Sequence, residues 1–330
     1  MSNDQGPATC VAGPLTLRAR WQAIPAVWRG TLYGAFAALC YSFTNAGLRQ
    51  VATRTDLEWA CWVAGWKVIP TAVAGMTLMG VMMWQGRAVW PPAGILWTLV
   101  ANGLLMQFLG NVLFQFGLSR AGLALSVPLC FASLIIMSAL LGRLVLGDAI
   151  RPRTVLAMGL LILAVVLLSQ GTRAATQPGA VSWVDAVWGA AAACGSGIGF
   201  SISGVVIRRS LRQGITISVV LGISATVGIL PLLLAVGRVG WTPLADVLSP
   251  ANQFALLSAG VLNAIGFFSV SEALRHLPVV RVNLINASQA ALGGLMGVLM
   301  FHEAPSWWLA TGTIVTISSL IVLGTQDEST

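Results

Sequence analysis

The sequence predicts an all-α integral membrane protein in which ten transmembrane helices form two inverted five-helix repeats. The first observation behind this prediction is the scarcity of charge: of 330 residues, 18 are Lys or Arg and 10 are Asp or Glu. The second is a hydrophobic share of 57%, with a mean hydropathy of +0.84. Soluble domains carry about 25% charged residues, so most side chains here must face lipid or one another. The third is an internal similarity between the two halves.

Long segments without charged residues predict the individual helices. One segment, 59–84, is interrupted only by Lys67, and each segment can cross about 30 Å of hydrocarbon at about 1.5 Å per residue. Because the runs are continuous and do not alternate, helices are expected in place of barrel strands. The nine uninterrupted segments are 30–48, 88–119, 121–142, 154–172, 186–207, 213–237, 247–271, 282–301 and 304–326.

The distribution of arginines predicts how these helices are oriented. If the N-terminus is cytoplasmic and the sides alternate, twelve arginines flank the helices on the cytoplasmic side and five on the outer side. Cytoplasmic segments of multi-pass proteins carry an excess of Lys and Arg. We therefore expect both termini to be cytoplasmic.

Weak matches between the halves predict the two repeats. At a shift of 155 residues, Ala132-Ser133, Gly142 and Asp148 align with Ala287-Ser288, Gly297 and Glu303. Five helices are an odd number, so the second copy enters the membrane from the opposite side, as in many secondary transporters. The expected organisation is a cytoplasmic segment at 1–27, repeats at 28–172 and 173–325, and a cytoplasmic tail at 326–330.

Two acidic residues occupy matching places in the two repeats. Asp148 and Glu303 each come shortly before a predicted helix. A carboxylate there satisfies free backbone amides and the positive end of the helix dipole. We therefore expect both to be helix caps.

Amide side chains follow one face of the third predicted helix. Gln107, Asn111 and Gln115 recur at intervals of four residues, which places them on one helix face. Two interpretations remain open: the amides line a path for a polar substrate, or they hydrogen-bond neighbouring helices to one another. Under the first interpretation, the candidate substrate-binding residues of the later helices are Asn263, Asn286 and Gln289.

Glycines mark a second face of the same helix. Gly103, Gly110 and Gly117 recur at intervals of seven, and Gly266 stands near Asn263 in the eighth helix. Small residues at such spacings let two helices approach closely. We expect these faces to be packing surfaces.

Lys67 and Trp66 form a further candidate substrate-binding pair, in the second predicted helix. A buried ammonium is costly, and tolerated examples face a cavity, a carboxylate or an anionic substrate. Trp66 offers a stacking wall or a cation–π contact. The alternative is a lysine that reaches the membrane interface with its long side chain.

Glu272 is a candidate for proton coupling, because it follows the polar face of the eighth helix. Arg275 lies three residues further on, at the spacing of an ion pair on a helix surface. The two roles remain open.

Motifs of enzymes and nucleic-acid-binding proteins are missing from the sequence. It contains no GxxxxGK[ST] loop, no HExxH and no GxSxG setting with a histidine partner. The five cysteines are scattered and form no CxxC pair. Basic residues do not cluster with aromatic ones on a polar segment. We therefore expect no enzymatic activity, no cofactor, no metal site and no nucleic-acid partner.

Two segments resemble the drug/metabolite transporter superfamily, in particular its bacterial ten-span EamA-type members. Leu140–Asp148, followed by a helix that ends at Leu167–Gly171, resembles the end of one EamA repeat. Met296–Glu303, followed by a helix that ends at Leu320–Gly324, resembles the end of the other. Asp148 stands where Glu is commoner. The likeness covers roughly residues 28–325.

The resemblance implies a multi-pass protein of the bacterial inner membrane that exports or exchanges amino acids, related metabolites or cationic drugs. It also implies a central cavity lined by helices 1, 3, 4, 6, 8 and 9. We predict a secondary transporter of small polar metabolites, with amino acids including aromatic ones as the leading class, working by alternating access. The expected partners are a small-molecule substrate and the lipid bilayer, and the expected state is a monomer or weak homodimer. The alternative is a non-transporting membrane scaffold or receptor with the same fold.

Overall fold

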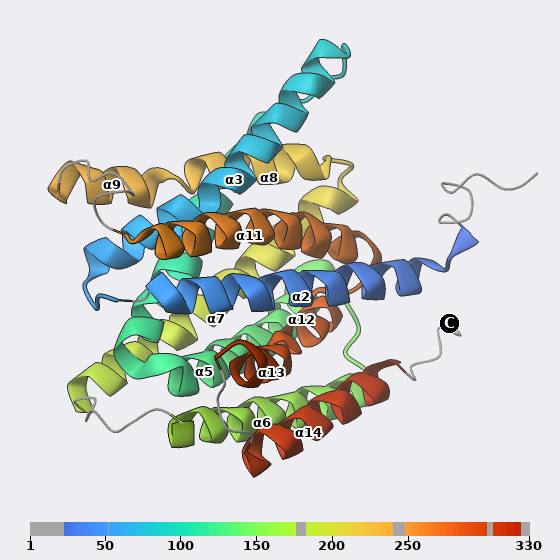
Figure 1. Cartoon of the computed structure of the whole chain (residues 1–330). Coiled ribbons are helices and arrows are strands. Elements are labelled where there is room, and N and C mark those ends of the chain that lie inside the picture. The colour runs from blue at the N-terminus through green and yellow to red at the C-terminus, as the bar shows by residue number, and fades with distance from the viewer. Residues whose placement is uncertain (1–22, 52, 176–182, 240–247, 302–305, 325–330) are drawn as a thin grey trace, which may run out of the picture.

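The computed structural model describes residues 23–51, 53–175, 183–239, 248–301 and 306–324 (Figure 1). Within these segments the chain forms helices and no β-strand, which confirms the all-α prediction for this part of the chain. The predicted tail 326–330, most of segment 1–27 and Glu303 lie outside the described residues. In chain order the helices are α2 (Ala26–Val51), α3 (Leu57–Trp84), α4 (Ala93–Leu105), the π-helix η1 (Met106–Val112), α5 (Leu113–Leu146), α6 (Pro152–Ala175), α7 (Trp183–Arg212), α8 (Ile217–Val227), α9 (Leu230–Val239), α11 (Pro250–His276), α12 (Val279–Ala287), α13 (Gln289–Phe301) and α14 (Trp307–Gly324).

Six helical segments are long and apolar enough to cross a membrane: Leu57–Trp84, Ala93–Ala121, Leu129–Leu146, Val187–Arg212, Ile217–Arg238 and Pro250–His276. Two shorter apolar helices, Pro152–Leu168 and Trp307–Val322, also coincide with predicted spans. The remaining predicted spans fall on α2, which carries Arg29, Asn45 and Arg49, and on α12–α13, which is interrupted at Ser288. A multi-pass membrane protein is thus supported, and the count of ten spans stays a prediction.

Large apolar side chains cover the outside of the helix bundle. Trp84 is 89% exposed, Trp307 83% and Phe254 76%. Exposed apolar surface of this extent is costly in water and favourable against lipid tails. The exposed side chains therefore agree with a protein surrounded by a bilayer.

The helices pack in pairs that join distant parts of the chain. The most extensive contacts are those of α5 with α7, α2 with α11, α6 with α14 and α3 with α8. Figure 1 shows α3 and α8 at one side of the bundle and α6 and α14 at the opposite side, with the other two pairs between them. The centre of the molecule is therefore built from α2, α5, α7 and α11 together with α12.

Helix α5 contains a reversal of the chain. The contacts of α7 are Gly189 with Ala121, Gly199 with Gly110, Gly197 with Cys130, and Arg212 with Leu146. From Gly189 to Gly199 of α7, the residue in contact changes from Ala121 to Gly110, so its residue number falls. From Gly197 to Arg212 of α7, the residue in contact changes from Cys130 to Leu146, so its residue number rises. Residues 109–121 therefore run antiparallel to α7 and residues 130–146 run parallel to it. The reversal lies between Ala121 and Cys130, as expected for two separate spans in this stretch.

The glycine faces predicted from the sequence are close helix contacts. A Cβ atom built on each glycine of the third predicted helix would lie within 3.0 Å of a neighbour: Gly103 from Ser224 of α8, Gly110 from Phe200 of α7, and Gly117 from Gly189 of α7. A Cβ on Gly266 would lie 3.2 Å from the Tyr41 ring. The prediction that these faces serve packing is confirmed.

The π-helix η1 interrupts the third predicted helix where the amides lie. Its seven residues bond from i to i+5 and thereby widen the turn. The side-chain Nδ2 of Asn111 donates to the Met106 carbonyl oxygen at 3.5 Å and to Gln107 Oε1 at 2.8 Å. The wide turn keeps Gln107 and Asn111 together and changes the direction of the residues that follow, including Gln115.

Helix α3 begins at a capping carboxylate outside the membrane-spanning segment. Asp56 Oδ1 accepts the backbone N–H of Trp59 at 2.8 Å, and Oδ2 accepts Arg54 Nε at 2.8 Å. Burial favours the protonated Asp56 carboxyl, but the Trp59 N–H and the Arg54 guanidinium outweigh burial and hold its pKa below the ordinary value. The cap fixes where the chain enters the helix that carries Lys67.

Candidate functional site

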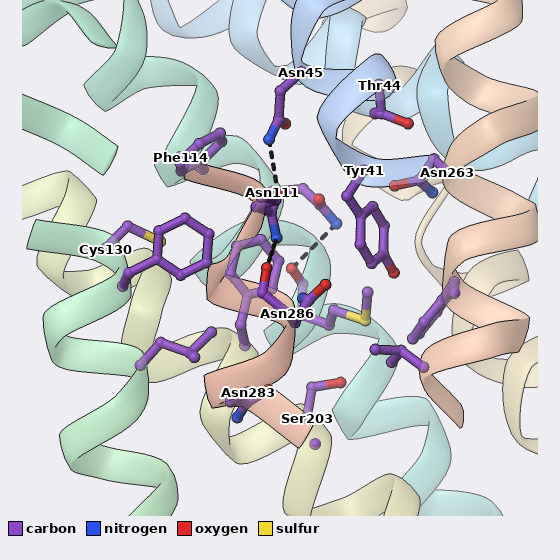
Figure 2. A pocket seen from close by; sticks show the side chains of 18 of the residues that line it. Tyr41, Thr44, Asn45, Asn111, Phe114, Cys130, Ser203, Asn263, Asn283 and Asn286 are labelled. Carbon is purple, nitrogen blue, oxygen red and sulfur yellow. Dashed lines mark hydrogen bonds between the residues drawn. The ribbon is translucent and has the colours of Figure 1, made fainter. Parts of the chain in front are cut away.

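A cavity of about 130 Å³ lies at the centre of the bundle (Figure 2). Residues of α2, α3, η1, α5, α7, α11, α12 and α13 line it, so the lining comes from both halves of the chain. Much of the wall is aromatic and suits an apolar or aromatic group: Tyr41, Phe114, Phe131, Phe200 and Phe267.

The polar part of the lining is rich in amides and contains a single charge. Lys67 is the charged residue, and no Asp or Glu occurs among the described residues that line the cavity. The described segments also hold no cluster of three or more His, Cys, Asp or Glu that could bind a metal ion. The other polar lining residues are Thr44, Asn45, Asn111, Ser203, Asn263, Asn283, Asn286 and Gln289.

Hydrogen bonds fix Lys67 through two amides of η1. Lys67 Nζ donates to Asn111 Oδ1 at 2.5 Å, and Asn111 Nδ2 donates to Gln107 Oε1 at 2.8 Å. Gln107 Nε2 donates to the Ala64 carbonyl oxygen at 2.8 Å. Ala64 and Lys67 belong to the same helix, so the bonds close a loop between α3 and η1. The ammonium is thereby held in one place at the cavity wall.

A second set of amides joins α2 to the interruption between α12 and α13. Asn45 Nδ2 donates to Gln289 Oε1 at 2.8 Å, and Gln289 Nε2 donates to the Asn286 carbonyl oxygen at 2.9 Å. Ser288, where the helix is interrupted, donates its hydroxyl to the Ile285 carbonyl oxygen at 2.6 Å. Two of these bonds thus bring side-chain donors to backbone carbonyls beside the interruption.

Three polar atoms beside the cavity are buried without a hydrogen-bond partner. They are Asn286 Oδ1, Asn283 Nδ2 and Ser203 Oγ. Figure 2 shows Asn283 and Ser203 at one end of the cavity and Thr44 and Asn45 at the other, with Asn286 between them. Buried polar groups nearly always have a partner. A polar solute in the cavity would supply one.

The structure brings five of the eight predicted substrate-binding residues to this cavity: Lys67, Asn111, Asn263, Asn286 and Gln289. Asn263 also donates to Thr71 Oγ1 of α3 at 3.4 Å. Their roles in binding remain predictions, but their meeting in one cavity is a finding. These five residues are far apart in the sequence and come together because the central helices cross at the cavity.

Gln107, Gln115 and Trp66 do not line the cavity. Gln107 lies behind Asn111 and bonds α3, and Gln115 is buried after the π turn. Trp66 packs edge-on against Trp62, with ring centroids 6.0 Å apart. These contacts agree with the alternative interpretation of the amides as bonds between helices, at least for Gln107.

Glu272 is paired with its neighbour on the helix surface. Its Oε1 lies 3.2 Å from Arg275 Nη1, with both side chains partly exposed. Glu272 is not among the residues that line the cavity. The geometry favours the surface ion pair over the coupling role.

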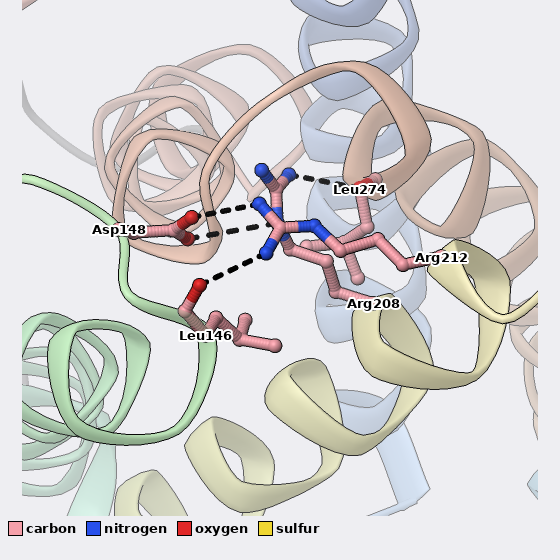
Figure 3. A network of polar contacts seen from close by, with 5 residues as sticks. All are labelled: Leu146, Asp148, Arg208, Arg212 and Leu274. Carbon is pink, nitrogen blue, oxygen red and sulfur yellow. Dashed lines mark hydrogen bonds and ion pairs between the residues drawn. The ribbon is translucent and has the colours of Figure 1, made fainter.

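An ionic network lies next to the cavity lining (Figure 3). Asp148 Oδ1 lies 2.8 Å from Arg212 Nη2, and Asp148 Oδ2 lies 3.6 Å from Arg208 Nε. Arg208 also donates to the Leu274 carbonyl oxygen at 3.0 Å. Leu274 and Ile207, the neighbour of Arg208, line the cavity. The network thus joins the ends of α5, α7 and α11 just beyond the lining.

The network corrects the expectation that Asp148 caps the next helix. Its carboxylate faces two arginines of α7 instead of the first backbone amides of α6. The residue is 10% exposed at its side chain and Arg208 8%, so each buried charge requires the other. The sequence did not show this, because the partners are about sixty residues away.

Several cavity residues were not singled out from the sequence. Tyr41 and Asn45 of α2 and the phenylalanines of α5, α7 and α11 carry no distinguishing spacing. Asn45 could have been found as the amide within the first apolar span. The phenylalanines could not, since such residues are equally common on lipid-facing surfaces.

Part of the chain matches one family model. Residues 187–325 match the model of the EamA-like transporter family. A search of curated proteins gave no match. Among solved structures, a chain described only as a crystal structure of a protein is similar, with a TM-score of 0.71 and 18% identity over 90% of this chain and 98% of that chain. At such identity the likeness concerns the fold alone.

Proposed function

We propose, from the premise that residues 187–325 form an EamA-like transporter family domain, that the protein is a secondary transporter of small polar metabolites. Amino acids, including aromatic ones, are the leading substrate class. The observation that carries the proposal is the central cavity, whose lining combines amides, hydroxyls and aromatic rings from both halves of the chain. Such a lining fits a solute with polar groups and an apolar body.

Alternating access between two inverted repeats is the proposed mechanism. In the two predicted repeats, α2 corresponds to α7, and α11 corresponds to the span that ends in the first part of α5. If the halves are exchanged, the contact of α2 with α11 therefore becomes the contact of α7 with the first part of α5. The same exchange returns α3 with α8, and α6 with α14, to themselves. All four pairs occur in the structure. This pairing supports repeats at 28–172 and 173–325 that rock about the central cavity.

The network of Asp148 with Arg208 and Arg212 supports a closed state at one end. Opening that end would require the ends of α5, α7 and α11 to separate, which breaks the ion pairs and the bond to Leu274. If the predicted orientation holds, this end is cytoplasmic. The proposed role as an exporter or exchanger in the bacterial inner membrane rests on the family resemblance. The excess of arginines on that side supports the orientation.

The test is counterflow of labelled amino acids in proteoliposomes. The cavity variant is Asn286→Ala, whose Oδ1 has no partner in the protein, so its removal should leave the melting temperature unchanged. We expect transport to fall fivefold or more, since one hydrogen bond contributes about 1 kcal/mol. The matched control is Gln213→Ala, an exposed amide away from the cavity.

A scaffold or receptor would behave differently in this test. It would give no counterflow with any solute of an amino-acid and metabolite panel, and Asn286→Ala would change nothing. That result would overturn the proposed function.

A further inference from the structure

Lys67 is the only lysine in the sequence and the only charged residue among those that line the cavity. Its side chain is buried, with the residue 7% exposed. Burying an ammonium is costly unless an opposite charge or several acceptors compensate it. The Lys67 ammonium in the cavity wall therefore requires an opposite charge or several hydrogen-bond acceptors.

The protein itself satisfies only part of this requirement. An ammonium has three N–H donors, and the structure gives Lys67 one acceptor, the neutral Asn111 amide. The loop through Gln107 to Ala64 fixes that amide, so it cannot follow the ammonium elsewhere. The arrangement holds a cation in position and leaves its charge to be balanced from the cavity.

We infer that Lys67 binds the carboxylate of the transported solute, an inference that rests on the proposed function of the cavity. A single ammonium balances a single negative charge, which fits a carboxylate better than a dianionic phosphate. Charge-assisted hydrogen bonds from an ammonium to a carboxylate are about twice as strong as neutral ones. Lys67 is thus the residue that makes the site specific for acids.

The other lining residues indicate which further groups the solute carries. Tyr41, Phe114 and Phe200 present rings to an apolar or aromatic body. Asn283 and Asn286 offer amide atoms without partners to a further polar group, such as an amine or hydroxyl. The solute class is a small acid with an apolar body, with or without an amino group.

Amines without a carboxylate are excluded on the same ground. No Asp or Glu occurs among the described lining residues, so an organic cation would meet Lys67 without a counter-charge. Two like charges in a cavity of about 130 Å³ repel strongly at low dielectric. This site therefore differs from one that accepts cationic drugs.

The test uses three solutes that share a phenyl group: 3-phenylpropanoate, phenylalanine and 2-phenylethylamine. Protein that contains lysine labelled with ¹³C at the ε carbon gives one side-chain signal, that of Lys67. We expect saturable shifts of this signal with the two carboxylates and none with the amine. Equal shifts with the amine, or no shift with any acid of a panel that varies the apolar body, would overturn the inference.

Two substitutions of Lys67 and one control substitution complete the test. Lys67→Met keeps the length and removes the charge, and we expect affinity for 3-phenylpropanoate to fall at least about tenfold. Lys67→Arg should retain most of it, and Arg238→Met, an exposed cation away from the cavity, should retain all of it. If Lys67→Met does not fold, the chemical shifts of the labelled parent protein and the affinity of Lys67→Arg still test whether Lys67 binds the carboxylate.

The outcome separates this inference from the proposed function. Uptake of phenylalanine without any response of Lys67 would overturn the carboxylate role and leave the transporter standing. Failure of every solute to be transported, with a Lys67 signal that still responds to acids, would overturn transport and leave the carboxylate site standing.

Discussion

Asn111 hydrogen-bonds in two directions, toward the cavity and toward a neighbouring helix. It accepts from Lys67 and donates to Gln107, which in turn bonds α3. The sequence left two roles open for the amide stripe: Asn111 makes the bonds between helices, and because it also lines the cavity, its contact with a substrate stays a prediction. A substitution here therefore affects stability and the site together.

Asn111→Leu should destabilise the protein by about 1–3 kcal/mol, because Lys67 loses its acceptor and Gln107 its donor. Thermal melting in detergent measures the effect. Gln115→Leu is the matched control in the same helix, since the buried Gln115 Nε2 has no partner to lose. An Asn111→Leu variant as stable as the parent would show that the loop between α3 and η1 contributes nothing.

Asp56 offers a prediction outside the membrane-spanning part. Asp56→Ala should cost about 1 kcal/mol by removing the cap of α3. Asp56→Asn should keep the cap and lose only the pairing with Arg54. Unfolding followed by circular dichroism compares the three proteins.

The same residue makes stability depend on pH. The folded-state pKa of Asp56 is lowered, so its stabilisation is fully present above the unfolded-state pKa and is lost as pH falls through the folded-state value. The stability difference between the parent and Asp56→Asn should therefore shrink on acidification below about pH 4. A difference that stays constant down to pH 2 would contradict this assignment.

At the scale of helices, glycine contacts set how closely neighbours pack. Gly110→Leu should lower folded yield, because a Cβ there already lies 2.8 Å from the Phe200 ring, and Gly266→Leu should do so against Tyr41. Gly80→Leu is the control, since nothing lies within 4 Å of a Cβ at that position. Size-exclusion chromatography of the three variants makes the comparison. Equal yields would refute the packing role.

A buried ion pair joins the helix ends next to the cavity. Asp148→Asn should destabilise the protein by about 3 kcal/mol, because Arg208 keeps its charge and loses its partner. Glu272→Gln removes an exposed pair and should cost less than about 1 kcal/mol. Chemical unfolding of both variants tests the contrast, and similar losses would mean that the Asp148 network is no stronger than a surface pair.

Helices were easier to predict than their contacts. Uninterrupted apolar runs located the helical regions, because lipid demands such runs, but not the breaks between α4 and η1, between α8 and α9 and between α12 and α13. The π turn at η1 was not predictable, since Gln107 and Asn111 have the same spacing of four in either kind of helix. The position of Gln115 and the partners of Asp148 depend on how distant helices cross, which one helix's periodicity does not contain.

For the whole molecule, the remaining prediction concerns sidedness. Reporter fusions at Arg212 and at Gln177, which lies outside the described residues, should report opposite sides of the membrane, with Arg212 cytoplasmic. A fusion at Gln213 serves as a second reporter for the Arg212 side. Both positions on one side would contradict the ten-span arrangement and, with it, the inverted repeats.

The π turn makes the site sensitive to the number of residues in the chain as well as to their kind. Each residue of an α-helix rotates the chain by about 100°. Deleting one residue between Ala101 and Met106, with η1 kept as a π-helix, would turn α4 against Asn111 by about that angle. Every side chain that lines the cavity would be retained, yet α4 could no longer contact α8 while Asn111 faces Lys67. The length of this helix is therefore itself part of the specification of the cavity.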